Sequence, residues 1–256
     1  MTVHLVGVGP GDAELMTLRA VRLLGEAEAV VHDRLIGDEV LSHVSPTAER
    51  YDVGKTPGVA GPTQDEINEL LVQLGRRLGC VVRVKGGDPC VFGRGAEEAD
   101  ACHAAGVPAE VVPGISSSIA APSAGGVSLT RRGVSSGFCV VTAHQDPGST
   151  DVDWGSPARC GLTVVVLMGA ARAAQIRERL TAGGMAPGTP VAVVTDATSD
   201  GQRTNRTTLD RLGEEPVRSP SVIVVGAVAD AELSTLAADH LVDRLLRSPS
   251  GDRRAI

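Results

Sequence analysis

Residues 83–100 have the sequence RVKGGDPCVFGRGAEEAD. An apolar run ends here, a glycine-rich turn follows, and a charged segment with alanines comes next. This order predicts a buried strand, a turn and a helix, and ligands of open α/β sheets lie at the carboxyl ends of such strands. The turn frees backbone groups at Gly86 and Gly87, and Asp88 offers hydrogen-bond acceptors. Because Arg94 can form a two-pronged pair with a carboxylate, the stretch predicts a polar ligand site.

Predicted strands and helices alternate along the whole chain. Short β-branched runs alternate with amphipathic, Ala-rich segments, which is typical of an α/β protein with much parallel sheet. A division at Pro113–Gly114 predicts an N-terminal α/β domain over 1–114, a C-terminal α/β domain over 115–245 and a polar tail over 246–256. The segment 145–160 is rich in Pro, Gly, Ser and Asp and is predicted to be a surface loop. Ten strands are predicted, at 3–8, 29–32, 50–53, 81–85, 110–112, 138–142, 163–168, 191–195, 204–209 and 221–225.

The composition is that of an ordinary globular protein, with 42% hydrophobic and 21% charged residues. Aromatic side chains are scarce, so the core must be aliphatic, which favours a buried parallel sheet covered by Ala-rich helices. Platforms for stacking nucleic-acid bases are not expected. The aromatic residues are Tyr51, Phe92, Phe138 and Trp154.

Charge and cysteine content narrow the function classes. A formal net charge of -7 argues against a broad nucleic-acid or anionic-membrane surface, whereas an anionic small substrate would need arginines gathered in one pocket. The five cysteines show no CxxC or CxxH spacing and predict neither a disulfide framework nor a zinc site. The chain opens on a strand-like run, without a leader pattern or a long apolar span, which predicts a cytoplasmic location.

The first predicted strand ends in GVGPGD, residues 7–12, and a helical pattern follows. Gly7 and Gly9 allow close approach of the backbone to a ligand, and Pro10 stiffens the turn. The turn differs from the dinucleotide fingerprint GxGxxG because Asp12 stands where the third glycine would be, which weighs against a nicotinamide oxidoreductase. A ligand turn and a plain tight turn both remain open.

A third glycine-containing segment is VVPGISSSIAAPSAGGVSLTRR, residues 111–132. Ser116, Ser117 and Ser118 either cap the following helix or bind a polar ligand. Arg131 and Arg132 form either a carboxylate clamp or two solvated surface charges. Neither alternative is excluded by the residues alone.

Several motifs in this order resemble the tetrapyrrole methylase family, and within it the members that methylate uroporphyrinogen III. The resemblance runs from residue 3 to about residue 228, and its most specific part is the KGGDP-x-VFGRG-x-EE block. It implies two α/β domains with the active site in the cleft between them, a homodimer, no metal, and S-adenosyl-L-methionine as cofactor. The motifs are GVGPGDAELMTLRA, VVHDRL, VGK, VRVKGGDPCVFGRGAEE, VVPGISSSIAAPSAGGVSLTRR, TVVVLMG, TPVAVV and SVIVVGAV.

The same resemblance implies roles for single residues. Two methyl groups would be added in turn to uroporphyrinogen III, giving precorrin-2 and S-adenosyl-L-homocysteine, with Asp33 as proton acceptor and Lys55 as proton donor. On the residues alone, Asp33 is equally well a turn residue and Lys55 a surface charge. The implied cofactor contacts are Pro10, Gly86, Gly87, Asp88, Val91, Ser116, Ser117, Met168 and Ala192. The implied substrate contacts are Arg94, Glu97, Arg131 and Arg132, with Arg94 also in a proton relay.

Two departures from the family pattern fall close to these residues. Cys90 stands where an aromatic residue is usual, and Arg131 replaces a histidine. Glu97 and Glu98 follow the turn, where acidic residues also stabilise a helix N-terminus without any further role. Alternatives to the implied activity are a later precorrin C-methyltransferase and a protein that binds cofactor or tetrapyrrole without turnover.

Overall fold

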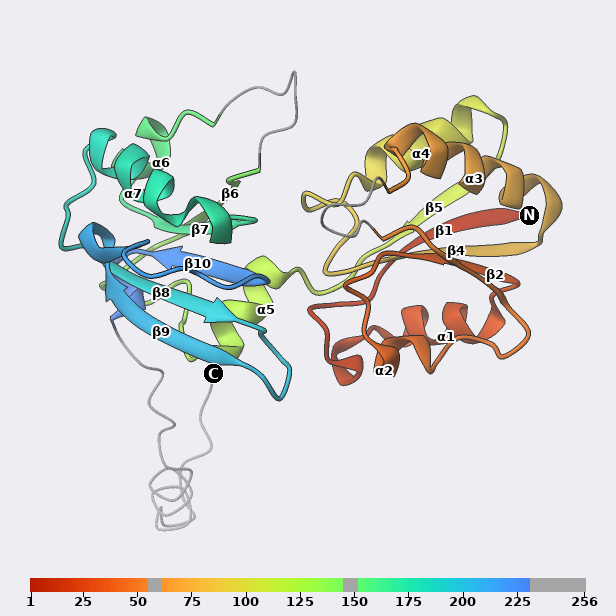
Figure 1. Cartoon of the computed structure of the whole chain (residues 1–256), viewed down its shortest axis with the longest axis horizontal. Coiled ribbons are helices and arrows are strands. Elements are labelled where there is room, and N and C mark those ends of the chain that lie inside the picture. The colour runs from red at the N-terminus through yellow and green to blue at the C-terminus, as the bar shows by residue number, and fades with distance from the viewer. Residues whose placement is uncertain (55–60, 145–151, 231–256) are drawn as a thin grey trace, which may run out of the picture.

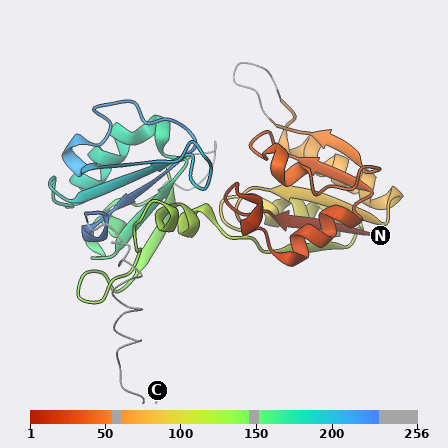
Figure 2. The same cartoon turned by 90° about the horizontal axis from the view of Figure 1, so that it is seen from below.

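The computed structural model describes residues 1–54, 61–144 and 152–230. Figure 1 shows two α/β halves side by side, each built on its own sheet, and Figure 2 shows the single segment that joins them. The first sheet contains β1 (Thr2–Gly7), β2 (Ala29–His32), β3 (Glu49–Asp52), β4 (Cys80–Lys85) and β5 (Ala109–Val112). The second contains β6 (Phe138–Thr142), β7 (Thr163–Leu167), β8 (Pro190–Thr195), β9 (Arg203–Thr208) and β10 (Ser221–Val225).

Helices cover both faces of the two sheets. In the first half they are η1 (Ala13–Leu15), α1 (Leu18–Glu26), α2 (Asp38–Leu41), α3 (Gln64–Arg77) and α4 (Gly95–Ala104). In the second half they are α5 (Ser117–Ala124), α6 (Gly155–Arg159), η2 (Ala170–Arg172), α7 (Ala173–Ala182), η3 (Leu209–Arg211) and η4 (Ala227–Ala229). Caps fix several starts: Thr63 and Glu66 form a reciprocal capping box on α3, and Thr17 accepts from the Ala20 amide at α1.

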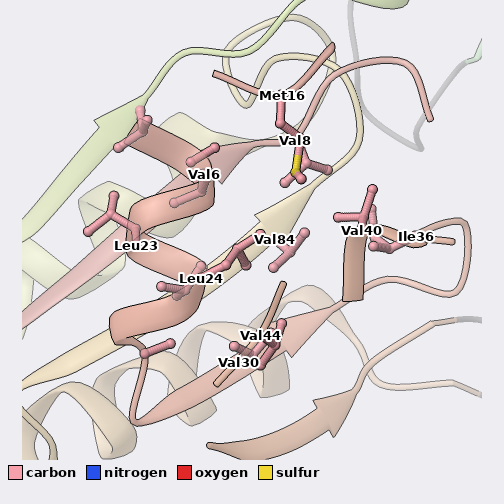
Figure 3. Packing of buried hydrophobic residues seen from close by; sticks show 14 of the residues in the cluster. Val6, Val8, Met16, Leu23, Leu24, Val30, Ile36, Val40, Val44 and Val84 are labelled. Atoms are coloured by element: carbon pink, nitrogen blue, oxygen red, sulfur yellow. The ribbon is translucent and has the colours of Figure 1, made fainter. Parts of the chain in front are cut away.

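The first sheet is wholly parallel and has the strand order β3-β2-β4-β1-β5. Each strand therefore sends its carboxyl end to the same edge. Period-2 alternation divides its aliphatic residues between two cores. Val6, Val30 and Val84 pack on α1 and α2 (Figure 3), and Leu5 and Val31 pack on α3 and α4.

The second sheet is mixed and has the order β6-β7-β10-β8-β9. β6 and β7 are parallel, whereas the β7–β10, β10–β8 and β8–β9 pairs are antiparallel. The expectation of much parallel sheet thus holds for the first half only. Residues 196–202 join β8 to β9 and are too few for a crossover helix, so this pair must be antiparallel.

All ten predicted strands are present, and each of their ends lies within one residue of the predicted limit. The prediction of a surface loop over 145–160 was wrong in its last third, where Gly155–Arg159 form α6. Residues 145–151 and the tail over 246–256 lie outside the described residues, and the predicted domain limits stay a prediction. Among the described residues, no helix is long and apolar enough to span a membrane.

Candidate active site

Three glycine turns meet at the carboxyl edge of the first sheet, after β1, β4 and β5. A Cβ on Gly114 would lie 2.3 Å from the Gly87 carbonyl oxygen, and one on Gly7 would lie 2.6 Å from the same atom. Gly9 and Gly87 also exchange backbone hydrogen bonds of 2.7 and 3.2 Å, with both residues at positive φ. The three predicted motifs are therefore one structure, in which glycine permits backbone to pack on backbone.

The Asp88 carboxylate joins two of these turns. Its Oδ1 accepts from the Cys90 amide at 2.8 Å, and its Oδ2 accepts from the Gly114 amide at 3.1 Å. Ser116 is buried and caps α5 through its hydroxyl, which accepts from the Ser118 amide. Both residues were predicted as cofactor contacts, and both have a local task in ordering the turns.

The two halves touch at this edge. The Asp12 amide, in the turn after β1, donates to Thr198 Oγ1 after β8 at 3.3 Å. Gln202 orders the loop by accepting from the Thr198 amide at 2.8 Å and donating to the Ala124 carbonyl at 2.9 Å. Figure 1 shows the β8 arrow pointing toward the first half. Since β7 runs parallel to β8 through their shared antiparallel neighbour β10, Met168 lies at this edge too.

Backbone strain is concentrated in the loops of this edge. Among the described residues, the non-glycine residues at positive φ all follow β4, β7 or β8. Such conformations cost of order 1–3 kcal/mol each and are typical of functional sites. Met168 is also 48% exposed, which is unusual for a methionine next to a buried strand. The strained residues are Phe92, Arg94, Met168, Asp196 and Thr198.

Charged side chains converge on the α3/α4 face of the first sheet. Arg83, in the middle of β4, is 2% exposed, and its Nη2 donates to Asp33 Oδ1 at 2.7 Å while its Nε donates to Glu98 Oε1 at 3.1 Å. Lys85 Nζ lies 3.0 Å from both carboxylate oxygens of Glu98, which is fully buried. Gln64 Nε2 adds a 3.3 Å hydrogen bond to Glu98 Oε1. Burial, followed by the nearby Arg83 charge, lowers the pKa of Lys85, and Glu98 opposes that shift.

Arg94 and Glu97 form a separate, exposed pair. Arg94 is the left-handed N-cap residue of α4, and its Nη2 lies 2.6 Å from Glu97 Oε2. Its Nε lies 3.0 and 3.1 Å from the two oxygens of Glu97. The predicted fork onto a carboxylate is thus present, with the carboxylate supplied by the chain itself.

Arg131 and Arg132 lie near the end of the second sheet where β7 starts, which is opposite to the end that carries Met168. Arg131 pairs through its backbone with Ser135, whose hydroxyl is 3.1 Å from Thr163 Oγ1 at the start of β7. Met168 follows the other end of β7, which at about 3.3 Å per residue is roughly 13 Å long. The structure therefore does not bring these arginines together with Asp33 and Met168.

The match to the family model described as Tetrapyrrole (Corrin/Porphyrin) Methylases covers residues 2–213. The chain belongs to the tetrapyrrole methylase family. This tetrapyrrole methylase is 44% identical over 232 residues to the S-adenosyl-L-methionine-dependent uroporphyrinogen III methyltransferase of Methanosarcina barkeri, covering 88% of the chain and 91% of the relative. It is 44% identical over 230 residues to the uroporphyrinogen-III C-methyltransferase of Pseudomonas aeruginosa, covering 88% and 93%.

A crystal structure of uroporphyrin-III C-methyl transferase from Thermus thermophilus complexed with S-adenyl homocysteine is similar in fold. It has a TM-score of 0.78 and 40% sequence identity, and the match covers 89% of this methylase and 93% of that chain. The α/β fold class expected from the sequence is thereby confirmed for the tetrapyrrole methylase.

The remaining predicted site residues differ in how accessible they are to a ligand. Pro10 and Val91 are partly exposed, and Val91 packs on the α5 side of the second sheet. Ala192 is fully buried inside that sheet, with its backbone paired to strands on both sides. Lys55 lies outside the described residues. A hollow at the carboxyl end of β6 contains none of the predicted site residues, and it is lined by Thr142, Ala143, Trp154, Arg172, Gln175, Ile176 and Arg179.

The sequence predictions did not include three residues that the structure places at this site. Arg83 and Lys85 stand two residues apart in a central strand that is otherwise all valine and cysteine, and they therefore point to one buried face. That pattern was a usable signal, since charged side chains are buried only when they are paired. Thr198 was missed as well, because its contact with Asp12 spans 186 residues and leaves no local pattern.

Proposed function

We propose that this tetrapyrrole methylase transfers two methyl groups in turn from S-adenosyl-L-methionine to uroporphyrinogen III, forming precorrin-2 on the route to sirohaem and cobalamin. The relatives described above support the substrate and the cofactor. One structural observation carries the chemistry. Asp33 directly follows β2 at the edge between the halves, and one of its carboxylate oxygens is held by buried Arg83 while the other has no protein partner among the described residues.

The edge between the halves suits an adenosyl cofactor. Half-exposed Met168 presents an apolar surface, and a Cβ on Gly86 would meet nothing nearer than Ile36 at 4.0 Å, so backbone groups there remain accessible. Small-molecule sites combine such apolar lining with a few fixed polar groups. We assign cofactor contact to Pro10, Gly86, Gly87, Asp88, Val91, Ser116, Ser117 and Met168. Ala192, predicted with them, is left out because it is fully buried inside the second sheet.

The chain must align the reactants and accept a proton. When bound, the cofactor supplies an electrophilic methyl group on a sulfonium, so no protein nucleophile is needed. Asp33 Oδ2 accepts the proton that the tetrapyrrole loses, while Arg83 holds Oδ1 and keeps the carboxylate in place. Lys55 is the proposed proton donor.

An acidic protein that binds a polycarboxylate needs locally arranged arginines. Arg94 is the accessible candidate at the first-half edge, where Glu97 orients its guanidinium and participates in a proton relay. Arg131 and Arg132, also predicted as substrate contacts, are left out of the proposed substrate set because they lie near the start of β7, away from Met168 at its other end. The protein is proposed to act as a homodimer in the cytoplasm. Its free cysteines support the location only, because reducing compartments keep thiols unpaired.

The test is anaerobic incubation of the purified protein with S-adenosyl-L-methionine and uroporphyrinogen III, followed by mass spectrometry of the tetrapyrrole. We expect addition of two methyl groups, and a loss of about 10²-fold or more in kcat for Asp33→Asn, the usual contribution of a general base. A protein that binds the cofactor but adds no methyl group would overturn the assignment. Methylation of later corrin precursors alone would move it to a later precorrin C-methyltransferase.

A further inference from the structure

Two carboxylates compete for one guanidinium in the first half. Arg83 donates through Nε to Glu98 at 3.1 Å and through Nη2 to Asp33 at 2.7 Å. Its Nη1 donates to the backbone carbonyls of Val84 at 3.2 Å and Val31 at 3.5 Å. Every nitrogen of the side chain therefore has an acceptor, and the orientation of the fork is set by all of them together.

The two competing carboxylates differ in burial and in restraint. The Glu98 side chain is 0% exposed and is also held by Lys85 and Gln64, whereas the Asp33 side chain is 40% exposed. Among residues 1–54, 61–144 and 152–230, Arg83 is the only side-chain partner of the Asp33 carboxylate. Glu98 is thus the fixed end of the arrangement, and Asp33 is the end that faces solvent.

We propose that Glu98 is a positioning residue that restrains Arg83 to a single hydrogen bond with Asp33, which leaves Asp33 Oδ2 open to receive the substrate proton. This inference rests on the proposed function. Arginine and carboxylate pair most strongly through two parallel hydrogen bonds. Without the pull of Glu98 on Nε, the fork turns and engages both oxygens of Asp33, and the proton acceptor is blocked.

The local fold explains why Glu98 can do this. Arg83 is in register with Val31 on the neighbouring strand β2, and Asp33 comes two residues later, on the same face. The Gly93–Gly95 turn brings the first turn of α4 directly over that face, since Cβ atoms on these glycines would collide with Pro89. Stability alone does not require the charges, because well-packed apolar residues often stabilise a core as well as a buried ion pair does.

The first experiment is steady-state kinetics of Glu98→Gln, which keeps the shape and removes the charge. We expect kcat to fall about tenfold or more, with the KM for each substrate changed less than about twofold, because only an arrangement used in the chemical step is lost. Calorimetric titration with S-adenosyl-L-homocysteine should still give one site per chain. Asp100→Asn, on the exposed part of the same helix, is the matched control and should leave kcat unchanged.

The second experiment repeats Glu98→Gln in an Arg83→Lys background, where a lysine cannot form the two-pronged pair. There the Glu98 change should lower kcat less than about twofold further, as expected when two residues act as one unit. An equal loss in both backgrounds would show that Glu98 acts independently of Arg83 and would overturn the inference. The inference would also be overturned if Glu98→Gln alone left kcat unchanged, or if it lowered kcat and the number of cofactor sites together. If the wild-type protein itself transfers no methyl group, the proposed function fails and the inference fails with it.

Discussion

Strand β4 and the turn over 129–135 each carry two basic residues, yet they differ in how those charges are held. Arg83 and Lys85 are buried and share a buried carboxylate. Arg131 and Arg132 are exposed, and no ion pair is recorded for them within the described part of the chain. The orientation of a buried charge is thus set by the groups packed around it, whereas an exposed arginine side chain keeps its rotamer freedom.

Removal of the shared carboxylate should give the largest effect. We expect Glu98→Ala to lower the free energy of unfolding by about 3–5 kcal/mol, because it removes the carboxylate that pairs with buried Lys85 and one of the two carboxylates that pair with buried Arg83. Urea unfolding at pH 7 measures the change. Arg131→Ala and Arg132→Ala are the matched controls, and each should stay within about 0.5 kcal/mol of the wild type. Equal changes in the two regions would show that burial does not determine how much these charges contribute to stability.

The close backbone contact between Gly114 and Gly87 should give the next largest effect on stability. We expect Gly114→Ala to destabilise the protein by about 1–3 kcal/mol, because its Cβ would overlap the Gly87 carbonyl, which cannot move without breaking the Gly9–Gly87 pairing. Thermal unfolding and binding of S-adenosyl-L-homocysteine measure the damage. Gly188→Ala, where a Cβ would meet nothing within 4 Å, should change stability by less than about 0.5 kcal/mol. A neutral Gly114→Ala would mean that the turns do not need close backbone packing.

These regions also show what could be predicted from the sequence. Strand limits were predictable because β-branched runs bounded by glycine and proline are local signals. The glycine turns were correctly placed at strand ends, but the sequence could not show that they pack on one another rather than only on a ligand. Asp88 illustrates this, since its two backbone hydrogen bonds reach residues that follow different strands.

The charged groups were predicted less completely, for a physical reason. Glu97 and Glu98 are neighbours with the same side chain, and helix geometry turns consecutive residues about 100° apart, so one faces solvent and the other the core. Which of the two faces inward depends on the start of α4, and the left-handed Arg94 decides that. The mixed second sheet was equally hidden, because the place of β10 between β7 and β8 is a long-range choice.

Steady-state kinetics can test whether the turn over 129–135 contacts the substrate. We expect Arg131→Ala and Arg132→Ala each to raise the KM for uroporphyrinogen III by less than about threefold, since both residues lie at the far edge of the second sheet from Met168. Arg94→Ala serves as the comparison at the first-half edge and should raise the same KM more. A tenfold rise for either exposed arginine would place part of the substrate at that far edge and restore the predicted clamp.

The smallest effect is expected at an exposed ion pair, Glu49 with Arg77. The Arg77 and Tyr51 hydrogen bonds lower the pKa of Glu49 from 4.5 to about 2. A carboxyl whose folded pKa is lowered stabilises the protein above its unfolded pKa, and this contribution is lost as the pH falls from about 4.5 to about 2. Glu49→Gln should therefore differ slightly from the wild type at pH 7 and converge with it toward pH 2.

Urea midpoints measured for both proteins across that pH range provide the check. The difference should also shrink as salt is added, since exposed pairs are screened and contribute little. Glu98→Ala should behave oppositely, with a deficit that persists in salt because its partners are shielded from water. A salt-resistant effect at Glu49, or a salt-sensitive one at Glu98, would show that burial does not separate the two kinds of charge in this protein.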